Sequence, residues 1–475
     1  MAGERFPTFR RIASGIAAWI TGDWRPRLRR LGWTLLITFV VLAIPWTYFN
    51  ITLGLQLEDT LAEIKARGEP LTIQQAIPEM PPRDENAAYV YEQAFRVFNM
   101  WEDARDDAVP GKLLSNLDRE MSDAVNDYVS GETPSLDPPV RQWLMSEEVS
   151  DRLAAIQRAS QMERCLFPVN WEDGYGALFP HMVLFRGAQR LVTARMMLAG
   201  RQGHTDEALQ WCEVGLRMTE HVGQEPTLIA FLVRVAMQDI LFGGAEQICG
   251  DLAIPPTTAR HLRDMIAAED LWEHFDRALL TERAFTLCML QHPDALIATI
   301  SDHPTLLWRL YPSLPAIPLR KNDQLTYLRL WDAQLAFTER RYREVAPIED
   351  PTELLLHRLR WFAPATHDLF PLFSRAVIKR EMGIAQLNQF QIALMLNVHR
   401  QVRGEYPETL DVLARVVNWQ PPHDIFSGEA FHYRREGDGY ILWSLASDLD
   451  NDGGEGPDAP GRDWEDCDIV WRAQR

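Results

Sequence analysis

The feature that most constrains this 475-residue chain is an uncharged stretch near the N-terminus: no Asp, Glu, Lys or Arg lies between Arg30 and Glu58. Its strongly apolar part, residues 31–49, has 19 residues. As a helix it would be ~28 Å long, close to the ~30 Å hydrocarbon core of a bilayer. Trp33 lies near one end and Trp46 near the other, where aromatic rings favour the lipid–water boundary. We expect residues 31–49 to be a transmembrane anchor in contact with membrane lipid.

The charge distribution predicts an orientation for this anchor. Residues 1–50 carry seven Arg and two acidic residues, a net charge of +5. The rest of the chain carries −24, which gives the overall net charge of −19. Basic flanks stay on the cytoplasmic side, which makes residues 1–30 a cytoplasmic basic segment. The location that follows is a bacterial inner (cytoplasmic) membrane, with a single-pass chain whose bulk is periplasmic or otherwise extracytoplasmic.

Two other interpretations of the apolar stretch stay open, a cleaved signal peptide and a buried core helix. No convincing small-x-small cleavage site follows it, and its 19 residues exceed the ~7–15 usual for the apolar region of a signal peptide. The net charge of −19 argues against a nucleic-acid partner, because phosphate binding needs a basic surface.

Glycine and proline predict a helical region over residues 50–374. No glycine occurs from Asp251 to Met382, whereas eleven prolines interrupt that stretch, a pattern typical of helices separated by proline breaks. One helix is expected to follow Thr257 or Thr258 and to bury one face, which consists of Leu262, Met265, Trp272, Phe275 and Leu279.

Residues 188–222 read as two helices around the Gly200–Gly203 turn, similar to a tetratricopeptide unit. A helical bundle and a short helical-hairpin array both remain compatible with this pattern.

The composition changes near Gly404. A long helix is expected from about Ala376 to Arg403, followed by short strands around the turn at Gly437, Asp438 and Gly439. The fold class is therefore mainly α, with a small C-terminal α+β module, residues 375–475, that contains an antiparallel sheet.

Several short motifs in the last ~95 residues carry a family resemblance. They are Gly404-Glu405-Tyr406-Pro407 after the long helix, Asp424-Ile425-Phe426-Ser427-Gly428, Tyr433, Ser444-Leu445, Asp448 and Asp466-Cys467-Asp468-Ile469. In order and spacing they resemble the C-terminal half of the major pseudopilins of type II secretion systems. The resemblance implies a long helix, a small antiparallel sheet and a calcium-binding loop. The whole chain also resembles large, uncharacterised bacterial single-pass envelope proteins.

Residues 437–468 contain ten acidic residues and one base, Arg462. So many carboxylates repel one another unless they stay solvated or share a cation, and calcium accepts six to eight oxygen ligands. Asp448, Asp450, Asp452 and Gly453 match the opening of an EF-hand loop, but Ala459 stands at the twelfth position. A solvated Asp/Gly-rich loop is the alternative to a calcium site.

The pseudopilin resemblance implies a specific ligand set for this calcium ion. The expected ligands are the Leu445 carbonyl, Asp448, Asp466 and Asp468, with Asp450 and Asp452 as additional or alternative ligands. Such an ion would order the loop and would not take part in catalysis.

No catalytic signature occurs in the sequence: G-x-S-x-G, H-E-x-x-H, Walker A and G-x-G-x-x-G are all absent. The five cysteines lack zinc-site spacing and are expected to be buried. We therefore expect a membrane-anchored extracytoplasmic binding or assembly protein with an unidentified envelope partner. An enzyme with a cleft in the helical domain, and a component or client of a type II secretion-like machine, are the alternatives.

Overall fold

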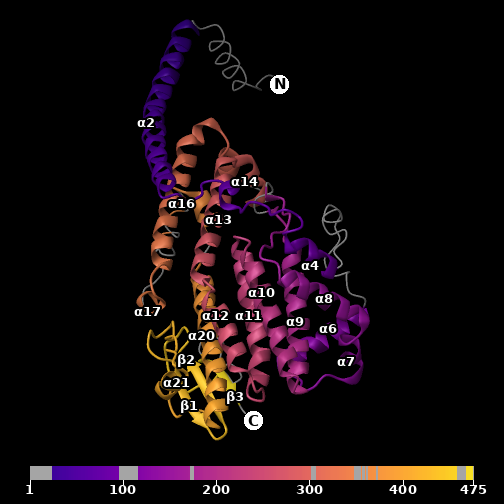
Figure 1. Cartoon of the computed structure of the whole chain (residues 1–475). Helices are drawn as coiled ribbons and strands as arrows, with labels where there is room; N and C mark the ends of the chain where they lie inside the picture. The colour runs from indigo at the N-terminus through magenta and orange to yellow at the C-terminus, as the bar shows by residue number, and fades with distance from the viewer. Residues whose placement is uncertain are drawn as a thin grey trace, which may run out of the picture.

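The computed structural model describes residues 24–95, 116–171, 176–300, 306–346, 355, 359, 362–370, 373–456 and 467–473. Within these ranges the protein is mainly helical, with a three-stranded antiparallel sheet near the C-terminus, as the fold class predicted. A long N-terminal helix projects from one end of the molecule, and the sheet lies at the opposite end (Figure 1). That the C-terminal part is pseudopilin-like remains a prediction.

Helix α2 (Trp24–Ala66) contains the predicted apolar segment and continues past it. The most apolar window of its Leu28–Ala66 part is 0 % buried, whereas Leu57 and Ile64, further along, are buried. By length and composition the helix is therefore a candidate membrane anchor or signal sequence. Pro45 lies within it, where a membrane helix tolerates proline.

After α2 come α3 (Ile73–Ala76), which packs against α13, and the helices α4 (Ala87–Phe95), α6 (Asn116–Val129), α7 (Pro138–Leu144) and α8 (Glu147–Ser160), which lie together on one side of the molecule (Figure 1). The central layer consists of α9 (Pro180–Arg201), α10 (Thr205–Gly223) and α11 (Leu228–Cys249), which pack against one another. The predicted pair of helices around the Gly200–Gly203 turn is confirmed. Helix α11 is also apolar enough to cross a membrane, but 56 % of its window is buried, as in a core helix.

Close helix packing in the central layer depends on glycine. An added Cβ at Gly200 would lie 2.8 Å from Ile248, and one at Gly244 on α11 would overlap Thr193 on α9. Real Cβ atoms almost never make such contacts, so α9 and α11 approach closely only because these positions lack a side chain.

The expected single helix through Leu262 and Leu279 is wrong. The structure has two helices, α12 (Pro256–Ala267) and α13 (Leu271–Gln291). Asp270 begins the second one, because its carboxylate accepts a hydrogen bond from the Glu273 N–H at 2.9 Å. An Asp side chain can accept a hydrogen bond from a backbone N–H in the first turn of a helix and so favours a helix start. The prediction from apolar spacing did not take this capping into account.

The chain then forms α14 (Pro293–Ile300), α15 (Leu306–Leu310), the 3₁₀ turn η3 (Leu314–Ala316), α16 (Ile317–Thr338), α17 (Tyr342–Val345) and α19 (Pro364–Leu369). Asp323 on α16 is fully buried and accepts hydrogen bonds from the Tyr311 hydroxyl at 2.8 Å and the Thr366 N–H at 3.0 Å. Burial raises the pKa of Asp323 to about 7, although both hydrogen bonds oppose the rise. This carboxyl joins α16 to α19 and to Tyr311, the residue that follows α15.

The predicted long helix is α20 (Ser374–Arg403), and Gly404 ends it with φ +83°. Arg380 on α20 and its neighbour Glu381 are both fully buried and form an ion pair. The Arg380 guanidinium lies 3.5 Å from the ring centroid of Trp272 on α13 and donates to the Thr338 carbonyl of α16. This arginine fastens α20 to two helices of the preceding region.

The C-terminal lobe consists of α21 (Leu410–Val417) and the strands β1 (His432–Glu436), β2 (Gly439–Ser444) and β3 (Ile469–Ala473), in the order β1-β2-β3. His432 pairs with Trp443, and Ser444 pairs with Ile469. The predicted strands around the Gly437 turn are confirmed, and β2 is buried along its length because it is the central strand.

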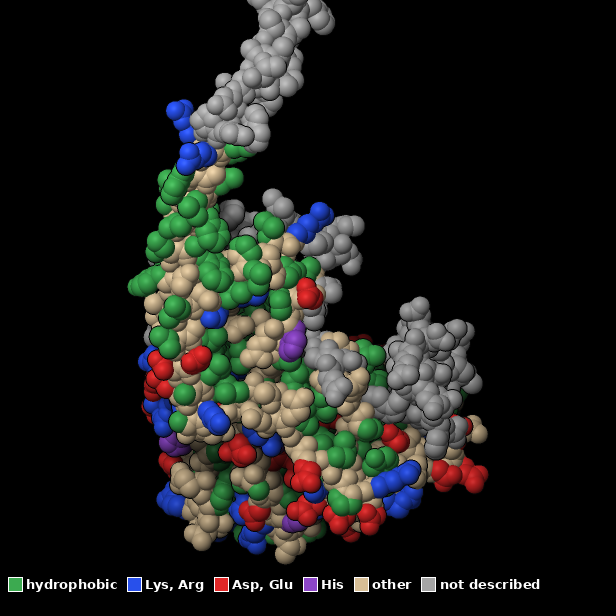
Figure 2. Space-filling model, turned by 90° about the horizontal axis from the view of Figure 1, so that it is seen from above, with side chains coloured by type: hydrophobic (Ala, Val, Ile, Leu, Met, Phe, Trp, Pro, Cys, Tyr) green, Lys and Arg blue, Asp and Glu red, His purple; other side chains and the backbone are tan. Residues whose placement is uncertain are grey.

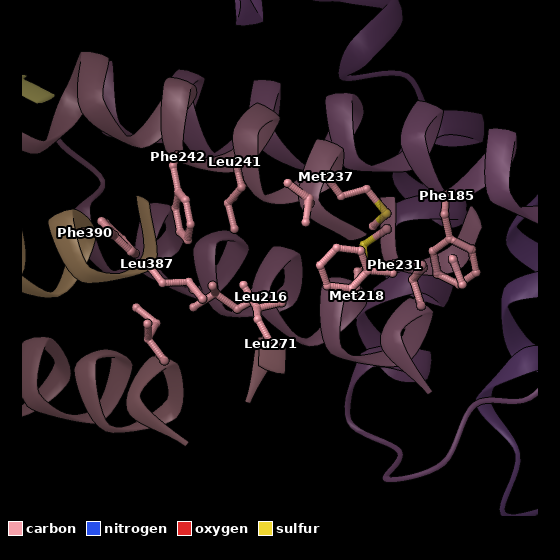
Figure 3. Packing of buried hydrophobic residues seen from close by; sticks show 14 of the residues in the cluster. Phe185, Leu216, Met218, Phe231, Met237, Leu241, Phe242, Leu271, Leu387 and Phe390 are labelled. Carbon is pink, nitrogen blue, oxygen red and sulfur yellow. The ribbon is translucent and has the colours of Figure 1, made fainter. Parts of the chain in front are cut away.

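One hydrophobic cluster extends from Leu57 to Ala473 and joins the helical region to the lobe. Figure 3 shows part of it, with Phe242 of α11 facing Phe390 of α20; the two rings are 4.9 Å apart. The Arg472 N–H of β3 also donates to Glu246 of α11 at 2.7 Å. The division at residues 374/375 remains a prediction.

Candidate functional site

The candidate site is the acidic loop that connects β2 to β3, described for residues 445–456 and 467–468. The first part turns sharply, since Ala446 and Leu449 adopt positive φ angles of 55° and 62° and Gly453 and Gly454 adopt 76° and 85°. Positive φ strains residues that carry a Cβ. The loop is thus held in a specific, partly strained conformation at the end of the sheet.

Asp468 lies at the centre of this loop, 1 % exposed, immediately before β3. Its Oδ2 accepts a hydrogen bond from the Gly454 N–H at 2.8 Å, and its Oδ1 is buried without a hydrogen-bond partner. Burial raises the pKa of Asp468 to about 6, and the nearby charges of Asp452 and Asp448 add to the rise. The structure therefore places a buried carboxylate, with one unsatisfied oxygen, close to two other carboxylates.

Asp448 lies in the turn after β2 and is exposed. Its Oδ1 accepts a hydrogen bond from the Asp450 N–H at 3.2 Å. Partial burial raises the pKa of Asp448, and the charges of Asp452 and Asp450 raise it further. Four of the predicted ligand residues, Asp448, Asp450, Asp452 and Asp468, thus interact electrostatically.

The structure shows less about the other two predicted calcium ligands, Leu445 and Asp466. Leu445 directly follows β2, at the start of the loop. Asp466 lies outside the described residues. Within the part of the chain that the structure describes, no group of three or more His, Cys, Asp or Glu side chains is arranged to hold a metal ion.

Hydrogen bonds from outside the acidic positions support the loop. The Trp443 indole and the Gly453 N–H both donate to the Asn451 side chain at 3.0 Å. The Tyr342 hydroxyl of α17 donates to the Ser447 carbonyl at 2.9 Å. Sequence reasoning missed these contacts, which join residues from β2 and from a helix about a hundred positions earlier.

Asp424 holds the end of β2 next to the loop. It is 1 % exposed, and its carboxylate accepts from the hydroxyls of Ser427 at 2.8 Å and Ser444 at 2.6 Å and from the N–H groups of Phe426 and Ser427. Such a carboxylate is satisfied without a cation. The spacing of Asp424, Ser427 and Gly428 is typical of an Asp-initiated turn, a signal that could have predicted this structural role.

A second buried polar group lies between α4, α8 and α10. His221 is bonded to the Tyr91 hydroxyl through Nδ1 and to the Met162 carbonyl through Nε2, each at 2.9 Å. Burial lowers the pKa of His221 to about 4, so the ring is neutral. Because the carbonyl can only accept, Nε2 carries the proton and Nδ1 accepts from Tyr91.

His181 and Glu225 pair beside it at 2.8 Å, 3 % and 2 % exposed, and Phe167 stacks on His181. These side chains come from distant positions, which the sequence did not link. His221 is hydrogen-bonded through both nitrogens, and His181 and Glu225 are almost fully buried.

Four of the five cysteines, Cys165, Cys212, Cys249 and Cys467, are buried as predicted, and Cys288 is half-buried. Burial raises the pKa of Cys165, Cys212 and Cys249, which keeps these thiols protonated and unreactive.

No protein-family model, curated protein or solved structure matches the chain.

Proposed function

We propose that the chain is a single-pass envelope protein anchored in the bacterial inner membrane by residues 31–49. The observation that carries the proposal is α2: none of its apolar window is buried, while Trp46 and Asn50 begin its packing against Pro315 and Lys321, and Leu57 and Ile64 are buried. An exposed apolar helix of this length is unfavourable in water and favourable in lipid. Seven arginines in residues 1–50 support a cytoplasmic N-terminus.

Topology is tested with the full chain carrying an epitope tag at each end. In spheroplasts, added protease should remove the C-terminal tag and leave the N-terminal tag protected. Digestion of the bulk only after the inner membrane is ruptured would contradict the orientation. Mass spectrometry of the purified chain separates the anchor from a signal sequence, since cleavage would remove residues before the mature N-terminus.

We further propose that calcium stabilises the loop between β2 and β3. The support is the unsatisfied, buried Oδ1 of Asp468 together with the carboxylates of Asp448 and Asp452, whose negative charges raise its pKa. A divalent cation would satisfy that oxygen and offset the repulsion. Its role is to order the loop beside β3.

The test compares thermal unfolding of the full chain in detergent with excess EDTA and with millimolar calcium. Binding at tenfold saturation contributes about 1.4 kcal/mol, and we expect calcium to raise the melting temperature. Asp468→Asn should abolish the shift. Asp438→Asn, an exposed acidic residue in the β1–β2 turn, removes the same charge outside the loop and should retain it. Identical melting curves with calcium and with EDTA would refute the site.

The helical region between the anchor and the lobe is proposed to serve binding or assembly with another envelope protein. The neutral His221, hydrogen-bonded through both ring nitrogens, supports this because it fits a structural role in the helical packing. In-cell cross-linking of the full chain, followed by purification and mass spectrometry, should give a discrete adduct. A chain that stays monomeric and uncross-linked would contradict the proposal.

A further inference from the structure

Helices α2 and α16 run side by side in the same direction, which fixes the level of each α16 residue along α2. The Trp46 indole donates to the Pro315 carbonyl at 3.0 Å, and Lys321 Nζ donates to the Asn50 carbonyl at 2.9 Å. Further along, Arg67 Nη2 donates to Asp332 at 2.9 Å. The start of α16 therefore lies at the level of residues 46–50, where the apolar segment of α2 ends.

The loop that precedes α16 is apolar and exposed at that level. No charged residue lies between Arg309 and Arg320. The Leu310 side chain is 54 % exposed and that of Leu314 is 75 % exposed. In the space-filling view, hydrophobic side chains cover the projecting α2 and the surface next to it, while most charged side chains gather away from it (Figure 2). We call residues 310–319 the apolar tip.

Protein groups satisfy much of the polar backbone of the apolar tip. Its three prolines, Pro312, Pro315 and Pro318, have no N–H to leave unbonded. Arg320 Nη1 donates to the Tyr311 carbonyl at 2.6 Å and to the Ser313 carbonyl at 3.0 Å. These hydrogen bonds reduce the number of backbone groups that need water, which favours contact with lipid.

We propose that the apolar tip is a second membrane contact, which inserts Leu310 and Leu314 into the leaflet from which α2 emerges. The hydrogen bond to Trp46 places η3 beside a residue that lies three positions, about 4.5 Å along the helix, inside the apolar segment. If residues 31–49 are in lipid, the tip reaches the same depth, so phospholipid is the occupant that fits. This inference rests on the proposed membrane span.

A transmembrane helix and an apolar tip, joined by α16, would hold the protein at a fixed angle to the membrane. One helix alone leaves the rest free to tilt, whereas two contacts define an orientation. The C-terminal lobe, at the end away from α2 (Figure 1), would then be held far from the bilayer surface.

The depth of the tip is measured on the full chain in phosphatidylcholine nanodiscs. Single cysteines carrying an environment-sensitive fluorophore are introduced in a Cys288→Ser background, because Cys288 is the half-buried cysteine and the other four are buried. The three sites are L314C in the tip, L36C within the apolar segment and V402C, 61 % exposed near the end of α20. Each is measured in discs with nitroxide lipids labelled near the headgroup or near the acyl-chain end.

The expected result is a blue-shifted L314C emission that the shallow nitroxide quenches more than the deep one. L36C should be quenched mainly by the deep nitroxide, and V402C by neither. If L36C is quenched while L314C behaves like V402C, the tip proposal fails and the membrane span stands. If L36C is unquenched, the span itself fails. A blue-shifted but unquenched L314C that cross-links into dimers would overturn the lipid contact in favour of a second copy of the chain.

Discussion

Two adjacent glycines in α11 offer a sharp test of the central helical layer. An added Cβ at Gly243 would meet nothing within 4 Å, whereas one at Gly244 would overlap Thr193 on α9 and lie 3.1 Å from the sulfur of Met197. Thr193 is fully buried and β-branched, so its side chain has little freedom to move. The same Gly→Ala change should therefore have opposite effects at neighbouring positions.

The magnitude follows from two contributions. Replacing glycine with alanine inside a helix stabilises it by about 0.5–1 kcal/mol, equally at both positions. Overpacking costs about 1–3 kcal/mol and applies only at Gly244. We expect G243A to raise the free energy of unfolding and G244A to lower it, with a difference of about 1–3 kcal/mol between the two variants.

The assay is denaturant unfolding of the full chain in detergent, followed by far-ultraviolet circular dichroism. T193S removes the methyl group that the new Cβ would meet, so the double variant G244A/T193S should recover most of the loss relative to T193S alone. Equal stabilisation by G243A and G244A, or no recovery in the double variant, would refute the proposed packing of α9 against α11.

Three further predictions concern buried charges. The folded pKa of Asp323, about 7, exceeds its usual 3.8, so its contribution to stability is fully present below about pH 4 and is lost as the pH rises through about 7. Asp323→Asn should remove this fall, of order 4 kcal/mol, whereas Asp332→Asn, at a half-buried carboxylate on the same helix, should retain it. Denaturant unfolding of both variants between about pH 4 and pH 8 checks the prediction. Arg380→Met leaves Glu381 buried without its partner and should lower the free energy of unfolding by about 3–5 kcal/mol. Adding E381Q should restore part of this loss. Equal melting temperatures of the single and double variants would contradict the prediction. Asp424→Ala removes the acceptor of four hydrogen bonds at the end of β2 and should lower the free energy of unfolding by about 2–4 kcal/mol. It should also reduce the rise in melting temperature caused by calcium. An unchanged melting temperature would show that the turn does not depend on Asp424.

Local chemistry let the sequence predict several elements well. The end of α20 at Gly404 followed from glycine's tolerance of positive φ, and the β1–β2 hairpin followed from the Gly437 turn. The division between α12 and α13 was missed, because apolar spacing alone does not show that Asp270 caps a new helix.

The candidate loop shows the same limit. Sequence reasoning identified its acidic residues from their density and order, and the structure brings Asp448, Asp452 and Asp468 within electrostatic reach. It did not identify which carboxylate would be buried. Burial of Asp468 depends on β3 pairing with β2 and on the Gly454 N–H approaching from the other side of the loop.

The apolar segment 31–49, the helical character of the middle region and the hairpin near the C-terminus could be predicted from the sequence, because length, charge and periodicity are properties of neighbouring residues. The packing of α20 in one core with α11, the neutral state of His221 and the position of the apolar tip level with Trp46 became visible only in the folded chain. These features depend on contacts between residues far apart in the chain, and desolvation and helix register exist only once those residues pack together.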